Sequence, residues 1–264
     1  MYRREKRCGM RVLFVGDVVA SGGCDYLRKK LPALKKQLGV DVTVINGENS
    51  ADQNGISKIS ADSLFSCGAD VITTGNHAFK QKNSLDIFDD EPYIIRPANF
   101  HRTACGKGFC ELDMGRYRVV VINLIGRTYM EPCDSPFDCI DALLKEIDTP
   151  NIIVDFHAEA TSEKRVMGFY LDGRVSAVVG THTHTQTADA QILKNGTAYV
   201  TDVGMVGSRY SVLGADVDCA TRKIVTCLPT RLNTAEAVDM EIDAVLIEID
   251  EKTGKAVSIE PVKA

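Results

Sequence analysis

The chain has 264 residues, 44% of them hydrophobic, and a formal net charge of -5 at pH 7. This length and apolar fraction suit a globular protein with its own core. The negative balance provides no overall basic field for a nucleic-acid backbone, so we expect no long nucleic-acid partner. No apolar run approaches the roughly 18 residues of a membrane span, so we expect no membrane partner either.

The cysteines and the first residues predict where the protein works. Its nine cysteines are an odd number and contain no C-x-x-C pair, a pattern typical of reduced thiols and of a cytoplasmic protein. Residues 1–9 are basic and lack an apolar signal core, so we expect a disordered leader there. Without an internal repeat or Pro-rich linker, residues 10–264 are expected to form a single domain.

The first hundred residues alternate short apolar runs with helical patterns, which is typical of parallel βαβ units. Strands are expected at residues 11–15, 42–45, 71–73 and 93–95. Helices are expected at residues 25–38, 60–67 and 78–88, the second of them closed by Gly68.

The pattern changes at Gly108, because residues 109–114 and 118–125 flank a Gly-Arg turn and predict an antiparallel hairpin. The sheet structure is therefore expected to be mixed. Thr161-Ser162-Glu163 is expected to cap a helix. The remaining expected strands are 152–156, 175–179 and 198–201, the helices are 136–147 and 161–171, and a terminal hairpin is expected from 238–249 and 256–259.

Polar side chains follow these predicted strands at the point where each strand ends. In Gly180-Thr181-His182-Thr183-His184, the i, i+2 spacing places both imidazoles on one side of an extended segment. In open α/β sheets, residues that follow separate strands converge on a ligand at the carboxyl ends of those strands. We expect this convergence for Asp17, Glu48, Asn76, His157, His182 and His184.

These residues are oxygen and imidazole donors without a thiolate, a set that suits Mn, Fe, Zn or similar divalent ions. There are enough donors for two ions, and Glu48 can bridge a pair about 3.5 to 4 Å apart. Such pairs clamp the attacking and leaving oxygens of a displacement at phosphorus, which indicates phosphoester hydrolysis. Each residue alone has an ordinary explanation, such as a helix cap or a turn. However, four of the five histidines follow predicted strands, and only His101 lies in a polar loop.

The motifs carry a family resemblance from about Met10 to the C-terminus. In this order they resemble the YmdB-like metallophosphoesterases, which are similar to calcineurin-type phosphoesterases and are described as 2′,3′-cyclic nucleotide 2′-phosphodiesterases. The resemblance implies a calcineurin-like α/β fold in which mixed β-sheets pack in a sandwich flanked by helices. The motifs are Gly16-Asp17, Asn46-Gly47-Glu48-Asn49, Gly75-Asn76-His77-Ala78-Phe79, the run from Asp155 to Glu163, and Gly180-Thr181-His182-Thr183-His184.

The resemblance also implies a role for each residue. One ion would be held by Asp17, Glu48, Asn49 and His184, and the other by Glu48, Asn76, His157 and His182. Glu48 would bridge the two ions, and His77 would act at the scissile phosphate as electrostatic stabiliser or general acid. The expected cofactors are two divalent transition-metal ions, Fe or Mn, with Zn as the alternative. Asp17 is followed by Val18-Val19, so the histidine of the superfamily's Asp-x-His motif is missing and the metal preference of that site stays open.

Our mechanistic hypothesis is that a hydroxide bridging the two ions attacks a cyclic phosphodiester in line and releases a 3′-nucleotide. The cyclic nucleotide as substrate comes from the resemblance alone. The alternatives are a broad phosphodiesterase or phosphomonoesterase, and a metal-binding regulatory protein with incidental hydrolysis. A metal-free flavodoxin-like nucleotide binder is disfavoured because the chain has no G-x-G-x-x-G loop.

Two further expectations concern partners. No substrate-binding residue is assigned, although Arg96 and Arg127 are considered as phosphate contacts; a surface arginine is the commoner explanation for each. A homo-oligomer is also expected, because the two predicted hairpins offer edges for assembly.

Overall fold

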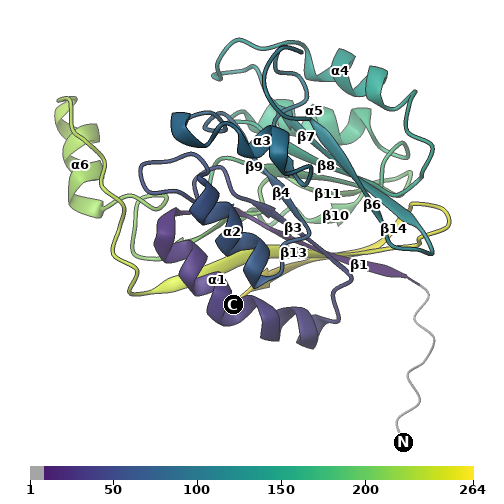
Figure 1. Cartoon of the computed structure of the whole chain (residues 1–264), viewed down its shortest axis with the longest axis horizontal. Coiled ribbons are helices and arrows are strands. Elements are labelled where there is room, and N and C mark those ends of the chain that lie inside the picture. Colours follow the sequence, from purple (N-terminus) through teal and green to yellow (C-terminus); the bar gives the residue numbers. More distant parts are fainter. Residues whose placement is uncertain (1–8) are drawn as a thin grey trace, which may run out of the picture.

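The computed structural model describes residues 9–264, in which two β-sheets pack face to face and helices cover the outer side of each sheet (Figure 1). The predicted α/β sandwich of mixed sheets is therefore confirmed. Residues 1–8 of the predicted leader lie outside the described residues. The single domain, the cytoplasmic location and the homo-oligomer stay predictions.

Strand β1 is the central strand of the first sheet. It runs parallel to β3, which continues in parallel through β4 to β5, and it pairs antiparallel with β13 on its other side. The carboxyl ends of β1, β3 and β4 therefore point to one edge. Within the described residues this sheet contains eight strands: β1 (Met10–Val15), β2 (Asp17–Val18), β3 (Val42–Asn46), β4 (Val71–Thr73), β5 (Ile94–Ile95), β12 (Met205–Ser208), β13 (Met240–Ile249) and β14 (Ala256–Lys263).

The second sheet has a parallel centre and antiparallel edges. Its order within the described residues is β10 (Gln191–Ile192), β11 (Ala198–Val200), β9 (Ala177–Thr181), β8 (Ile152–His157), β7 (Arg118–Ile125) and β6 (Phe109–Asp113). β7, β8, β9 and β11 are parallel, whereas β6 and β10 pair antiparallel at the two edges. The predicted hairpin at residues 109–125 is thus confirmed.

Alternating side chains of β1 divide the core into layers. Val12 and Phe14 pack in a cluster that includes Val121 of β7, which lies between the two sheets. Leu13 and Val15 point the other way and pack against the helices on the outer face of the first sheet. This period of two is the pattern of a strand that is buried on both faces. The layers hold the strand ends, and the polar residues that follow them, in fixed positions.

Four of the described helices cover these faces. They are α1 (Ala20–Leu38) and α2 (Lys58–Cys67) on the first sheet, and α4 (Pro136–Leu143) and α5 (Thr161–Tyr170) on the second. Gly68 closes α2 as predicted and takes the left-handed backbone conformation that glycine tolerates. Helix α4 ends four residues before its predicted end, because the amides of Lys145 and Glu146 bond to carbonyls three residues back in a tight turn.

Helix α1 begins at Ala20, five residues before its predicted start. We expected a loop through Gly22 and Gly23, but the Gly23 amide donates to the Val19 carbonyl at 3.0 Å and belongs to the first turn. A Cβ on Gly23 would lie 2.9 Å from the carbonyl oxygen of Val206. Gly23 therefore lets the helix approach the sheet, whereas a Cβ on Gly22 would lie 2.9 Å from the Cβ of Ala237. Neither glycine marks a loop.

The helix predicted at residues 78–88 is wrong. The structure has a turn, a short 3₁₀ helix η1 (Lys82–Ser84) and a single helical turn α3 (Ile87–Asp90). Phe79 packs with its ring centroid 5.3 Å from that of Phe88 and 5.7 Å from that of Phe100. This aromatic contact folds the segment back on itself, so tertiary packing overrides the helical pattern.

The predicted cap of α5 is also wrong. Ala160 occupies the N-cap position and makes no side-chain cap, while Thr161 is the first helical residue. Glu163 turns away from the helix end and accepts hydrogen bonds from the amides of Arg127 and Thr128. It therefore fixes the loop after β7.

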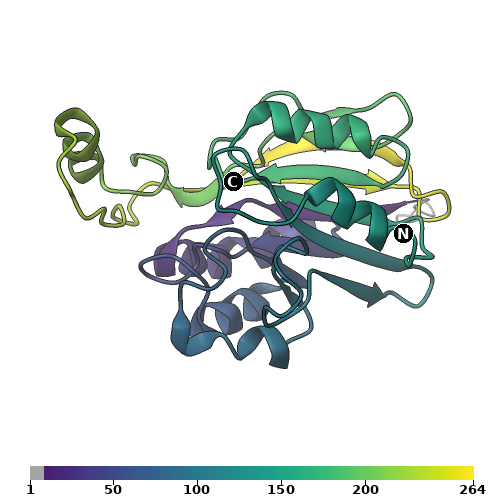
Figure 2. The same cartoon turned by 90° about the horizontal axis from the view of Figure 1, so that it is seen from above.

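A segment that we did not predict projects from one end of the sandwich. We call residues 209–239 the arm; it lies between β12 and β13 and carries α6 (Val217–Thr226), as Figures 1 and 2 show. The arm is mostly exposed, and Ala220 is the buried residue of α6. Among residues 9–264, no helix combines the length and the apolar character that a membrane crossing requires.

Candidate metal centre

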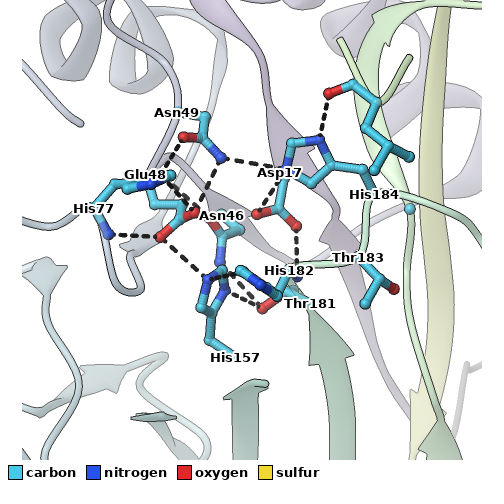
Figure 3. A network of polar contacts seen from close by, with 12 residues as sticks. Asp17, Asn46, Glu48, Asn49, His77, His157, Thr181, His182, Thr183 and His184 are labelled. Carbon is cyan, nitrogen blue, oxygen red and sulfur yellow. Dashed lines mark hydrogen bonds and ion pairs between the residues drawn. The ribbon is translucent and has the colours of Figure 1, made fainter. Parts of the chain in front are cut away.

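The predicted ligand residues lie together at one edge of the sandwich, where the carboxyl ends of parallel strands from both sheets meet (Figure 3). Asn76 joins them through its contact with His157. The first sheet contributes the residues after β1, β3 and β4, and the second sheet contributes the end of β8 and the loop after β9. Asn46 joins the two sheets, because its Nδ2 lies 3.1 Å from Asp155 Oδ2 and 3.3 Å from Thr181 Oγ1. The predicted convergence is therefore present.

One half of the site is a tight group around Glu48. The donor atoms of Glu48, His157 and His182 all lie within 4.8 Å of one another. His157 Nε2 lies 3.2 Å from Glu48 Oε2, 3.0 Å from Asn76 Oδ1 and 3.0 Å from His182 Nδ1. These four residues are the set that the family resemblance implies for one ion.

The other half lies around Asp17. His184 Nε2 is 3.6 Å from Asp17 Oδ1 and 3.2 Å from Asn49 Nδ2. Asn49 directs its amide oxygen to His77 Nδ1 at 2.7 Å and its nitrogen to Glu48 and His184. Asn49 could therefore bind an ion through its oxygen only after its side-chain amide flips, which exchanges the positions of the oxygen and the nitrogen.

In each histidine of the predicted ligand set, one ring nitrogen contacts a polar group on the side away from the other ligands. His157 Nδ1 lies 2.9 Å from the Thr181 hydroxyl, which itself donates to Asp155 at 2.7 Å. His182 Nε2 lies 3.1 Å from a carboxylate oxygen of Glu159. His184 Nδ1 donates to the Leu213 carbonyl at 2.9 Å.

In each case the other nitrogen faces the shared space, which is the arrangement that orients histidine ligands of metals. Asp17 Oδ1 is buried there and has no hydrogen-bond partner among the described residues. A buried carboxylate oxygen without a hydrogen bond is costly unless a cation binds it. The residues present thus fit divalent ions.

Electrostatics inside the site follow from burial and from these contacts. Burial raises the pKa of Asp17, against the opposing effect of His184. Burial alone would raise the pKa of Glu48, but His157 and His77 hold this pKa well below its usual value. Burial alone would lower the pKa of His157, yet Glu48 raises it to about 9. Glu48 therefore stays ionised.

His182 differs from its neighbour. Burial and the nearby His157 lower the pKa of His182 to about 3, so His182 is neutral at physiological pH. Neutral imidazole is the form that binds metal ions.

The backbone around the two histidines of the Gly-Thr-His-Thr-His motif is unusual. His182 has φ 100° and His184 has φ 59°, a left-handed conformation that costs of order 1–3 kcal/mol at a residue other than glycine. Thr183 between them is held by Asp202, which accepts from its amide at 3.0 Å and from its hydroxyl at 2.7 Å. Lys164 of α5 pairs with the same carboxylate at 2.7 Å, and both charged groups are buried. This buried ion pair fixes Asp202, and Asp202 in turn holds the strained loop in place.

His77 lies at the edge of the site and lines the cavity described below. Its backbone amide donates to Glu48 Oε2 at 3.1 Å, and its Nδ1 lies 3.3 Å from Glu48 Oε1. Among the described residues, none hydrogen-bonds its Nε2. Gly75 precedes this segment, and a Cβ there would overlap Glu48 and His157. Only glycine lets the chain pass so close to the centre.

A cavity of about 800 Å³ opens above these residues. Its floor includes Glu48, His77, His182 and His184, and its far wall comes from the arm. This volume falls within the range of small-molecule sites.

The two arginines considered as phosphate contacts do not line this cavity. Arg96 is 6% exposed, and its guanidinium donates to the carbonyls of Pro97, Ala98, Cys105 and Gly106. It is therefore a structural arginine inside the protein, contrary to both explanations offered from the sequence. Arg127 contributes its backbone amide to the Glu163 contact.

Sequence reasoning missed the residues that support the ligands. Asp155 was detectable, because it is two residues before His157 on one strand and must point to the same side. Asp202 was also detectable by the rule that identified the ligands, since it follows β11. Glu159 lies within the family motif from Asp155 to Glu163, although no role was assigned to it, and no signal pointed to the Leu213 carbonyl.

Comparison with known proteins identifies the family. The YmdB-like protein profile matches residues 13–262. Over 253 residues the chain is 48% identical to a Bacillus subtilis protein named 2′,3′-cyclic-nucleotide 2′-phosphodiesterase, covering 95% of this chain and 96% of the relative.

Two solved structures share the fold. A hypothetical protein from Thermus thermophilus is 37% identical with a TM-score of 0.91, covering 97% of this chain and 99% of the other. A novel phosphatase from Mycoplasma pneumoniae is 30% identical with a TM-score of 0.92, covering 97% and 93% respectively. The family recognised in the sequence, its fold and the expectation of a phosphoric diester hydrolase are confirmed. The chain belongs to the YmdB-like protein family.

Proposed function

We propose that this phosphoesterase binds two divalent transition-metal ions and opens 2′,3′-cyclic nucleotides at the 2′ bond, which releases 3′-nucleotides. The observation that carries the proposal is the group of Glu48, His157 and His182, whose donor atoms lie within 4.8 Å of one another at the floor of a nucleotide-sized cavity. The substrate is taken from the name of the Bacillus subtilis relative.

The ligand sets follow the two halves of the site. Glu48, Asn76, His157 and His182 would hold one ion, and Asp17, Asn49 and His184 would hold the other, with Glu48 shared. When bound, the ions would supply an activated water and neutralise charge that develops on the phosphate. The donors are imidazole nitrogens and carboxylate or amide oxygens, which suit Fe, Mn and Zn; Fe or Mn is the metal that we expect and Zn the alternative.

The chain's own residues would hold the cations in place and supply a proton. Glu48 stays ionised, so it can hold cations at neutral pH. His77 lines the cavity beside Glu48, where its imidazole can stabilise the phosphate or protonate the leaving 2′ oxygen. The Glu48 and Asn49 contacts to His77 Nδ1 fix the orientation of the ring.

A second candidate is a broader phosphodiesterase and phosphomonoesterase. A Mycoplasma pneumoniae relative, 31% identical over 96% of this chain, is named a putative phosphatase/phosphodiesterase. The ligand arrangement suits attack on either a diester or a monoester.

The test is elemental analysis of the purified protein together with its rates on 2′,3′-cyclic AMP, 3′,5′-cyclic AMP and a simple phosphomonoester. We expect about two equivalents of transition metal, preference for the 2′,3′-cyclic substrate and 3′-AMP as the product in chromatography. Two metals with comparable rates on the monoester would favour the second candidate. A protein that takes up no metal after reconstitution would overturn the site.

A further inference from the structure

The arm forms one wall of the cavity that borders the metal centre. The Leu213 carbonyl at the base of the arm holds His184, and residues 212–215 and 231–234 line the cavity. Backbone hydrogen bonds from Asp216 to Asn233 and from Ala235 to Gly214 join the two strands of this base. The arm therefore has a defined position relative to the ligands of the metal.

One face of α6 looks into the cavity. Ala220, Lys223 and Ile224, at spacing i, i+3 and i+4, are its lining residues, and this spacing places them on the same side of the helix. Arg231 lines the cavity from the segment that returns after α6. The arm wall thus combines apolar side chains with two cations.

The charged residues that line the cavity differ in whether they pair with other residues of the protein. Among its carboxylates, Glu48 pairs with His157, Glu159 with His182, and Asp52 accepts from Ser21. Lys223 and Arg231, by contrast, have no ion pair or side-chain hydrogen bond with any described residue. The cavity therefore offers positive charge that the protein itself does not use.

These two cations lie on the wall formed by the arm, whereas the scissile phosphate belongs at the floor with the metal ligands. A substrate whose only anionic group is the cyclic phosphate would leave both cations without a partner. A nucleotide with a second phosphate would pair them, since Arg and Lys both bind phosphate oxygens. The apolar side chains beside them, Leu213, Ile224 and Leu232, suit contact with a nucleobase.

We propose that Lys223 and Arg231 form a subsite for a second phosphate, and that the preferred substrate is a 2′,3′-cyclic nucleotide that carries one. This inference rests on the proposed function, and it adds the substrate class. The second phosphate could be the 5′-phosphate of a mononucleotide or the internucleotide phosphate of a short oligonucleotide that ends in the cyclic group.

The experiment compares kcat/KM of the metal-loaded protein on three substrates: adenosine 2′,3′-cyclic phosphate, its 5′-phosphorylated form, and the adenosine dinucleotide that ends in a 2′,3′-cyclic phosphate. Because both cations are exposed to solvent, we expect the second phosphate to raise kcat/KM by about tenfold at low salt. Whichever of the two larger substrates shows the increase identifies the source of the phosphate.

Matched variants assign this preference to the two side chains. The double variant Lys223→Ala/Arg231→Ala should bring the ratio of kcat/KM values to within about twofold of one. Lys223→Arg/Arg231→Lys keeps both cations and should retain most of the preference. Arg222→Ala removes a neighbouring exposed charge of α6 that does not line the cavity, and it should retain the preference in full.

Equal kcat/KM values on all three substrates in the wild-type protein, or a preference that survives in the double alanine variant, would overturn the subsite. If none of the substrates is hydrolysed, the proposed function fails and calorimetry decides the subsite separately. Adenosine 3′,5′-bisphosphate should then bind about tenfold tighter than 3′-AMP to the wild type but not to the double variant. Equal affinities would refute the subsite.

Discussion

The metal centre and the arm border the same cavity, but they are built in opposite ways. In the centre, Asp17, Glu48 and His157 are fully buried and are held by elements of both sheets. In the arm, Lys223 and Arg231 are exposed and have no partner among the described residues. The difference teaches that the proposed reacting groups lie on rigid elements, while the proposed substrate selection lies on α6 and the segment after it, apart from the Leu213 contact that holds His184.

The change that would break the centre most severely is Glu48→Gln. It keeps the shape of the side chain but removes the charge shared by both halves of the site. We expect loss of metal and a fall in kcat/KM of about 10³-fold or more, since removing even one group that stabilises developing charge costs about 10²–10³-fold. Elemental analysis and steady-state rates measure both effects, with circular dichroism as the control for folding. Unchanged turnover would exclude the bridging role.

His77→Ala separates the catalyst from the ligands. The variant should keep its metal and slow the chemical step by about 10²-fold or more, the usual contribution of a positioned acid or of an electrostatic stabiliser. Single-turnover kinetics on metal-loaded protein measure this step directly. Loss of metal in this variant would instead place His77 among the ligands.

Asp202→Asn tests the support of the strained His182-Thr183-His184 loop. It leaves Lys164 buried without its partner, so we expect metal affinity to fall by about 10–100-fold, the size typical of residues that orient ligands. Titration calorimetry with Mn²⁺ and thermal unfolding of the metal-free protein are the measurements.

A matched double variant controls that experiment. Asp202→Asn with Lys164→Met removes both buried charges, and it should recover part of the thermal stability while metal affinity stays low. Recovery of full metal affinity in the double variant would show that Asp202 acts only on stability.

The smallest effect on the centre is expected from the arm. Replacing residues 218–230 with a short Gly-Ser linker removes most of α6 but keeps the base that contacts His184. Metal content should stay at the wild-type value, because no predicted ligand is lost, whereas KM should rise several-fold, up to about tenfold. A loss of bound metal would show that the arm also supports the metal centre.

The centre could be predicted because its ligands obey a local rule. Asp17, Glu48, Asn76, His157 and the two later histidines each follow a buried strand, and parallel strands bring their carboxyl ends to one edge. The strands themselves were visible as apolar runs, and the structure reproduces their positions within a few residues. Local sequence therefore predicted the mixed α/β class and the edge at which these residues converge, whereas their roles as metal ligands stay a proposal.

The parts that were missed depend on contacts distant in sequence. Gly23 resembles a loop residue until β12 approaches it, and Phe79 fits a helical pattern until Phe88 and Phe100 pack around it. Arg96 resembles a surface residue until four carbonyls surround its guanidinium. Helix α6 is the exception, because its sequence is amphipathic and Asp216 caps it, so both local signs were present and were overlooked.

Strand β1 has a consequence for the way the molecule matures. Asp17 follows β1, and β1 lies between β3 and β13, so its position is complete only after residues 240–249 have paired. His182 and His184 come from a different sheet, which must also dock before the ligands meet. During synthesis, the amino-terminal half of the chain thus contains only part of the proposed binding site, and we expect tight metal binding only after both sheets have formed.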